Sequence, residues 1–65
     1  MPLVGSHVLI VEDEVLLALE LVDELNLMAA HPIGPIPSVE EALGLIESGR
    51  KLDAAVINVF LRGSV

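Results

Sequence analysis

Three short, continuous runs of apolar residues alternate along this chain with two segments in which apolar residues recur at helical spacing. The runs occupy about residues 8–12, 30–33 and 54–59. Continuous apolar runs are typical of strands whose two faces are both covered, as in parallel sheets. The second run contains Pro32, which has no backbone N–H to donate, so we expect that strand to lie at a sheet edge.

Two helices are predicted between the strands, over about residues 14–28 and 39–48. The second has clear boundaries. Ser38 and Glu41 form a capping box, in which the Ser38 hydroxyl caps the Glu41 amide and the Glu41 side chain reaches back, and Gly49 supplies a left-handed end. The positions expected to face the core are Ala18, Leu21, Val22 and Leu25 in the first helix, and Val39, Ala42, Leu43 and Ile46 in the second.

Leu16 and Leu27 fall on the side of the first helix that also carries its acidic residues, Glu20, Asp23 and Glu24. Leucine side chains gain no stabilisation on a face that is exposed to water. Two interpretations stay open: the two leucines form a contact with another molecule, or they are scattered surface leucines of a common kind.

The order strand, helix, strand, helix, strand predicts an α/β fold, with a parallel sheet joined by right-handed crossovers. The 65 residues allow one small domain or part of one. A chain of this size buries only about 60% of its unfolded surface, and no cysteine is present to crosslink it. Because 54% of the residues are apolar, we expect some apolar surface to be covered by another molecule.

The formal net charge of −7 excludes several classes of partner. The three basic residues, Arg50, Lys51 and Arg62, are too few to neutralise the phosphates of a nucleic acid or to hold an anionic membrane surface. The longest apolar runs reach five residues, as at 15–19, whereas a membrane span needs roughly 20. The N-terminus has no basic region of the signal-peptide type. We therefore expect a cytoplasmic protein.

Three motifs occur in a fixed order: Val-Leu-Ile-Val-Glu-Asp-Glu at 8–14, Ile-Gly-Pro followed by Ser-Val-Glu-Glu-Ala-Leu between 33 and 43, and Asp-Ala-Ala-Val-Ile-Asn-Val-Phe-Leu-Arg-Gly at 53–63. In this order and spacing they resemble the receiver domain of bacterial response regulators. The resemblance covers about residues 6–63 and only the first half of that family's domain. It implies a partial receiver-like domain over residues 1–65, with a truncated flavodoxin-like βαβαβ fold and a three-stranded parallel sheet in the order 2-1-3.

The family transfers a phosphoryl group from a histidine kinase to an aspartate at the end of the third strand, beside Mg²⁺ held by acidic residues after the first. The resemblance places Glu12 and Asp13 at the acidic positions, Asp13 as the more direct ligand, and gives the backbone of Phe60 a role at the metal. Asn58 occupies the acceptor position. An amide is a poor nucleophile and cannot form the phosphoryl anhydride, so no catalytic residue is assigned. No cofactor is required, and any Mg²⁺ site is expected to be weak.

The third strand is expected to expose its outer edge, because the fourth strand of the family has no counterpart here. A bare edge of Ala54, Ala55, Val56, Ile57 and Asn58 is a template for pairing. We expect a homodimer built across this edge, with Leu16 and Leu27 as an alternative interface. Addition of this strand to the sheet of another protein stays open as well.

The sequence thus favours a non-enzymatic pseudo-receiver in two-component signalling, which acts by binding a histidine kinase, a full receiver or itself. Two alternatives stay open. The chain could be a weakly active, Mg²⁺-dependent phosphoacceptor, or a fragment with no activity beyond dimerisation.

Overall fold

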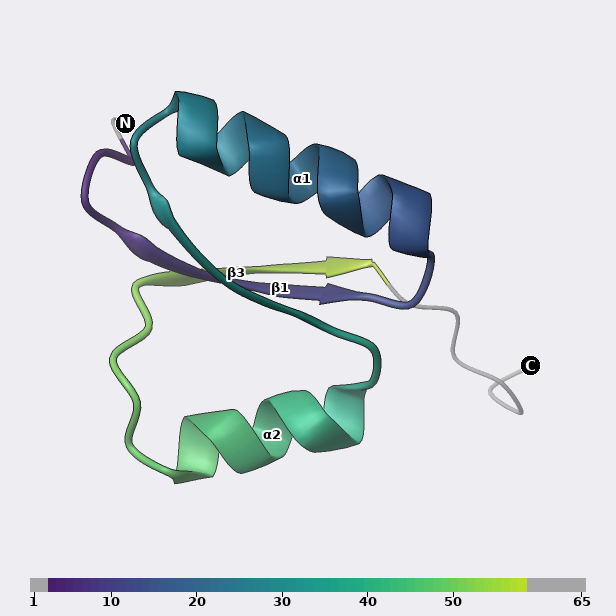
Figure 1. Ribbon diagram of the computed structural model, residues 1–65. Coiled ribbons are helices and arrows are strands. Elements are labelled where there is room, and N and C mark those ends of the chain that lie inside the picture. Colours follow the sequence, from purple (N-terminus) through teal and green to yellow (C-terminus); the bar gives the residue numbers. More distant parts are fainter. Residues whose placement is uncertain (1–2, 59–65) are drawn as a thin grey trace.

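The computed structural model describes residues 3–58, which form five elements in the predicted order (Figure 1). The strands are β1 (His7–Glu12), β2 (His31–Ile36) and β3 (Ala54–Asn58). The helices are α1 (Val15–Leu27) and α2 (Val39–Glu47). The two helices lie on opposite faces of the sheet, as Figure 1 shows. Among the described helices, none is long and apolar enough to cross a membrane.

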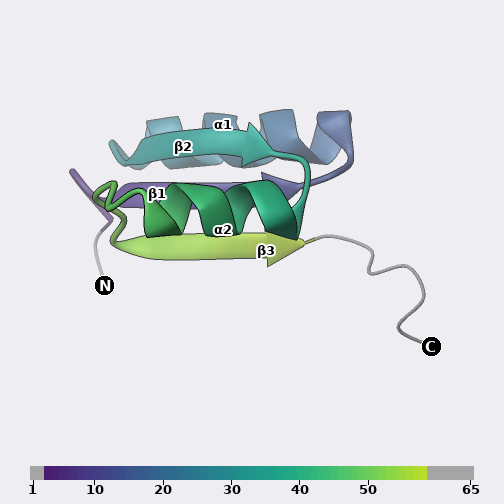
Figure 2. The same ribbon diagram turned by 90° about the horizontal axis from the view of Figure 1, so that it is seen from below.

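The sheet is parallel and has the order β2-β1-β3 (Figure 2), which confirms the predicted α/β fold class and strand order. Its central strand, β1, is the run Val8 to Val11, and all four of these side chains are at most 2% exposed. Successive side chains of a strand point to opposite faces. Val8 and Ile10 therefore pack under α1 with Leu25 and Ala30, while Leu9 and Val11 pack under α2 with Ala42.

Strand β2 lies at an edge, as Pro32 required, but it is longer than the predicted 30–33 because it continues to Ile36. The predicted range stops before Gly34 and Pro35, two residues that interrupt most strands. An edge strand accommodates both residues, with a register shift against β1 between Leu9 and Val11. Gly34 has φ +111°, and a Cβ there would lie 2.9 Å from the carbonyl oxygen of Ile10, so the close approach of the two strands requires glycine.

The predicted inner face of α1 is confirmed, because Ala18 and Leu25 are buried and Leu21 and Val22 pack against the core cluster that contains Leu25. The ends of α2 also follow the prediction. The Glu41 amide donates to the Ser38 hydroxyl at 3.3 Å, and that hydroxyl donates to the Glu41 carboxylate at 2.9 Å. Gly49 has the left-handed φ of +80° just after the helix.

The predicted inner stripe of α2 is wrong at two positions. Ala42 is buried and Leu45 packs beside it, but Leu43 and Ile46 are each 52% exposed. The helix packs over β1 and β2 only. Leu43 and Ile46 therefore lie on parts of the helix that these two strands leave uncovered. Periodicity alone identified an apolar face without showing how much of it the sheet reaches.

Candidate functional site

Glu12 and Asn58 meet at the carboxyl ends of two neighbouring parallel strands. Glu12 is the last residue of β1, Asn58 is the last residue of β3, and the two are partners in the strand register. Residues paired in a parallel register project to the same face, so the fold brings together two side chains 46 positions apart in the sequence. The carboxyl ends of strands are where open α/β sheets ordinarily carry their sites.

The Asn58 side-chain amide donates a hydrogen bond to Glu12 Oε2, with an N···O distance of 2.6 Å. The other oxygen, Oε1, accepts from the backbone N–H of Glu14 at 3.0 Å. Glu12 is only 4% exposed and is the one buried charged residue in the described part of the chain. Burying a carboxylate is unfavourable unless donors replace its water shell. The Asn58 amide and the Glu14 N–H supply those donors.

An aspartate at position 58 could not make the Asn58 contact, because an ionised carboxylate has no proton to donate. Two carboxylates at that separation would repel each other unless a cation or a proton lay between them. The amide therefore has a structural role at the position where the receiver resemblance places the phosphoacceptor. It stabilises the buried charge of Glu12 without an ion.

The predicted metal residues do not gather around an ion-binding space in the described part of the chain. Asp13 is an exposed residue just beyond β1, and Phe60 lies outside the described residues. Residues 3–58 contain no group of three or more histidine, cysteine or acidic side chains placed to hold a metal. Both oxygens of Glu12 already accept hydrogen bonds from the protein. Within residues 3–58, Glu12 and Asp13 alone do not provide the several oxygen ligands that octahedral Mg²⁺ needs, and the expected weak site stays a prediction.

A second polar cluster, which the sequence reasoning missed, lies at the opposite end of the sheet. Asp53 Oδ2 accepts a hydrogen bond from the backbone N–H of His7 at 2.7 Å. The same oxygen lies 3.4 Å from His7 Nδ1, within ion-pair range but without hydrogen-bond geometry. The His7 and His31 rings lie 5.1 Å apart between centroids. The sequence did contain one indication of this cluster. All three residues stand at or just before the beginning of a strand, and the beginnings of parallel strands meet at the same end of a sheet.

These contacts lower the pKa of the Asp53 carboxyl below its ordinary value. The largest cause is the backbone N–H of His7. Desolvation opposes it, and the His7 side chain and the Lys51 charge add smaller effects that also lower the pKa. The Asp53 side chain is exposed, so it links the start of β1 to the residue before β3 at the surface of the molecule. We assign this cluster a structural role.

The predicted interface residues of β3 are largely exposed. Val56 is half-buried, Ile57 is 64% exposed, and the others are exposed as well. Among the described strands, β3 pairs only with β1, so its outer edge has no partner strand within residues 3–58 (Figure 2). The predicted second interface is also at the surface, with Leu16 70% and Leu27 88% exposed.

The chain was compared with models of protein families, with curated proteins and with solved structures, and none of them matches. The βαβαβ arrangement with strand order β2-β1-β3 is consistent with part of a flavodoxin-like fold. The receiver resemblance therefore rests on the motifs themselves and on the place of Glu12 and Asn58 in this sheet.

Proposed function

We propose that this chain is a non-phosphorylatable, receiver-like module of two-component signalling that acts by binding other proteins rather than by catalysis. The observation that carries the proposal is the hydrogen bond from the Asn58 amide to the buried Glu12 carboxylate. In a phosphorylatable receiver, a carboxylate at the acceptor position needs a metal ion to offset the neighbouring acid. Here the amide offsets the acid and is itself unable to accept a phosphoryl group.

A binding role is also supported by the amount of apolar side chain at the surface. The exposed large apolar residues of the described part are Val4, Val15, Leu16, Leu17, Leu19, Leu27, Met28, Leu43, Ile46 and Ile57. Strand β3 adds an outer edge of unpaired backbone groups, and such an edge favours strand pairing. We propose homodimerisation across Ala54–Asn58, or addition of this strand to a kinase or a full receiver, in the cytoplasm.

Labelling with acetyl phosphate tests the phosphoacceptor part of this proposal. The chain is incubated with acetyl phosphate and Mg²⁺, and its intact mass is measured, with a phosphorylatable receiver treated in parallel as a positive control. We expect no mass gain on this chain while the control gains one phosphoryl group. A Mg²⁺-dependent gain of one phosphoryl group would instead support the alternative of a weakly active receiver.

Capture of partners tests the signalling part. Immobilised chain is offered purified histidine kinases and full receivers, with and without acetyl phosphate. Binding that does not depend on phosphorylation is the expected result. Failure to bind any of them, together with self-association, would favour the alternative of a fragment that only dimerises.

A further inference from the structure

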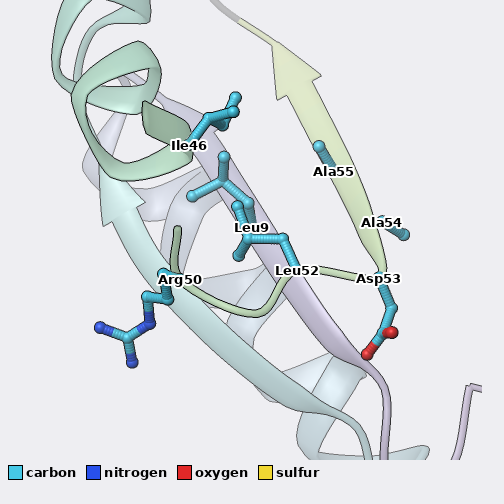
Figure 3. Close-up of a pocket in the computed structure, with 7 residues that line it drawn as sticks. All are labelled: Leu9, Ile46, Arg50, Leu52, Asp53, Ala54 and Ala55. Atoms are coloured by element: carbon cyan, nitrogen blue, oxygen red, sulfur yellow. The ribbon is translucent and has the colours of Figure 1, made fainter. Parts of the chain in front are cut away.

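A groove of about 390 Å³ lies between α2 and β3, on the face of the sheet that α2 covers incompletely. In Figure 3 the side chains of Leu9, Ile46 and Leu52 gather in its middle, while the Arg50 guanidinium and the Asp53 carboxylate lie at its margins. Ala54 and Ala55 form the β3 wall. Ala55, the register partner of Leu9, projects to this face of the sheet; its small side chain leaves room above the strand, and no described helix packs over it.

The charge around this groove is unlike that of the rest of the chain. Arg50 lines the groove, and Lys51 follows it in the same loop, close enough to Asp53 to lower the pKa of that carboxyl. These two are the basic residues of the described part of a chain whose formal net charge is −7. Two negatively charged copies repel each other over most of their surfaces. The margin of the groove, where Arg50 and Lys51 lie, can instead attract an acidic surface of another copy.

The outward face of α1 has the complementary character. Leu16, Leu19 and Leu27 are 70%, 52% and 88% exposed. Glu20 and Asp23 are exposed between them. Counted from Leu16, the five residues stand at i, i+3, i+4, i+7 and i+11, a spacing that forms one stripe on a helix. We call these five residues the outer stripe of α1. The helix contains no basic residue. The outer stripe thus combines apolar side chains with negative charge.

We propose that the outer stripe of α1 from one copy of this chain docks in the α2–β3 groove of a second copy. A copy cannot fill its own groove in this way, because α1 and α2 lie on opposite faces of the sheet (Figure 1). In the docked arrangement the leucines of the stripe cover Ile46, Leu52 and Ala55, and Glu20 and Asp23 approach Arg50 and Lys51. The helix thereby covers the face of β3, which is how sheets of this class bury their apolar faces.

This contact is heterologous, because it joins two different surfaces, and it uses the face of the sheet rather than the edge of β3. A heterologous contact adds copies in a series that forms either a closed ring or an open chain. Pairing of β3 edges instead gives a symmetric dimer and stops at two copies. The two kinds of contact therefore differ in how the mass grows with concentration and in which residues they require.

Reversal of charge on each surface separately tests the contact. One variant carries Glu20→Lys and Asp23→Lys, and the other carries Arg50→Glu and Lys51→Glu; all four side chains are exposed, so both variants should fold. Sedimentation velocity at micromolar concentrations should show association of the unaltered chain beyond a dimer. Each variant alone should associate about ten-fold more weakly or not at all. An equimolar mixture of the two should associate again, because each then offers the surface that the other attracts.

The matched control carries Glu14→Lys and Glu40→Lys, which change the net charge as much as the α1 variant but lie outside both surfaces. Circular dichroism of every variant establishes that it is folded. The control should associate at least as strongly as the unaltered chain. The inference is overturned if the unaltered chain is a monomer, if it stops at a dimer that neither reversal weakens, or if the mixture of variants stays monomeric.

The inference deepens the self-association part of the proposed function and rests on it. The two fail in different experiments. A phosphoryl group on this chain would overturn the proposed function while leaving the association data unchanged, whereas loss of the α1–groove contact would leave labelling and partner capture unaffected.

Discussion

Strands β1 and β3 are neighbours with similar sequences and opposite surroundings. They pair in parallel from Val8 and Ala54 to Glu12 and Asn58, and both are apolar along most of their length. Yet Ile10 and Val11 are fully buried, whereas Ile57, the register partner of Val11, is 64% exposed. The difference comes from the neighbours, because both helices pack over β1 and β2. An apolar strand in this protein is buried only where a helix and a second strand cover it.

The largest expected effect comes from truncating one isoleucine on each strand. Ile10→Ala should lower the free energy of unfolding by about 2–5 kcal/mol, because it removes a fully buried side chain and leaves a cavity. The matched Ile57→Ala should change it by less than about 0.5 kcal/mol. Urea unfolding followed by circular dichroism in dilute solution measures both. Equal losses of unfolding free energy in the two variants would contradict the difference in burial between β1 and β3, since they would mean that β3 is covered in solution.

A smaller effect is expected at the carboxyl ends of β1 and β3, which the Asn58–Glu12 hydrogen bond joins. Asn58→Asp replaces a donor to Glu12 with a second carboxylate, and should cost about 2 kcal/mol of stability at neutral pH. The repulsion raises the pKa of the carboxyl pair in the folded state above its unfolded value. The loss should therefore be present at neutral pH and shrink as the pH falls and one carboxyl takes up a proton.

Unfolding midpoints in urea between about pH 7 and pH 4 would show this recovery. Asn58→Ala is the control, because it removes the donor without adding a charge and should lack the recovery. If Asn58→Asp is as stable as the unaltered chain at neutral pH, the Asn58–Glu12 hydrogen bond is not what stabilises the buried carboxylate.

The smallest effect concerns the other end of the same two strands. The pKa of Asp53 is lowered in the folded state, mainly by the backbone N–H of His7. Its stabilising contribution is therefore present above the unfolded pKa of about 3.9 and is lost as the pH falls through the lowered value. Asp53→Asn keeps an oxygen that can accept from His7. The difference in unfolding free energy between the unaltered chain and Asp53→Asn should narrow below about pH 4. A difference that stays constant with pH would contradict the lowered pKa of Asp53.

Much of the fold could be predicted from local patterns. The continuous run of β1, the Ser38–Glu41 capping box and the edge position imposed by Pro32 each follow from the chemistry of a few neighbouring residues. The end of β2 could not be placed, because Gly34-Pro35 ends a strand in most settings and is tolerated here only at an edge. The exposure of Leu43 and Ile46 could not be foreseen either, since it depends on how far the sheet extends beneath α2.

The candidate site also has one part that the sequence predicts and one part that depends on tertiary contacts. Reading Glu12 and Asn58 as ends of adjacent strands required only the strand order, and the sequence indicated that order by resemblance. Whether the two side chains touch depends on register, which no local pattern contains. The His7–Asp53 contact was missed for that reason.

By itself, the sequence determined the order and approximate positions of the strands and helices of this protein, its strong excess of negative charge, and the amide at position 58. Those properties depend on side-chain chemistry and on spacing within a few residues. Only the tertiary structure decided that the amide satisfies a buried carboxylate, that β3 is largely exposed, and that a groove with basic residues at its margin lies beside it. Each of these depends on which distant segments come into contact, and burial and charge pairing arise only from such contacts.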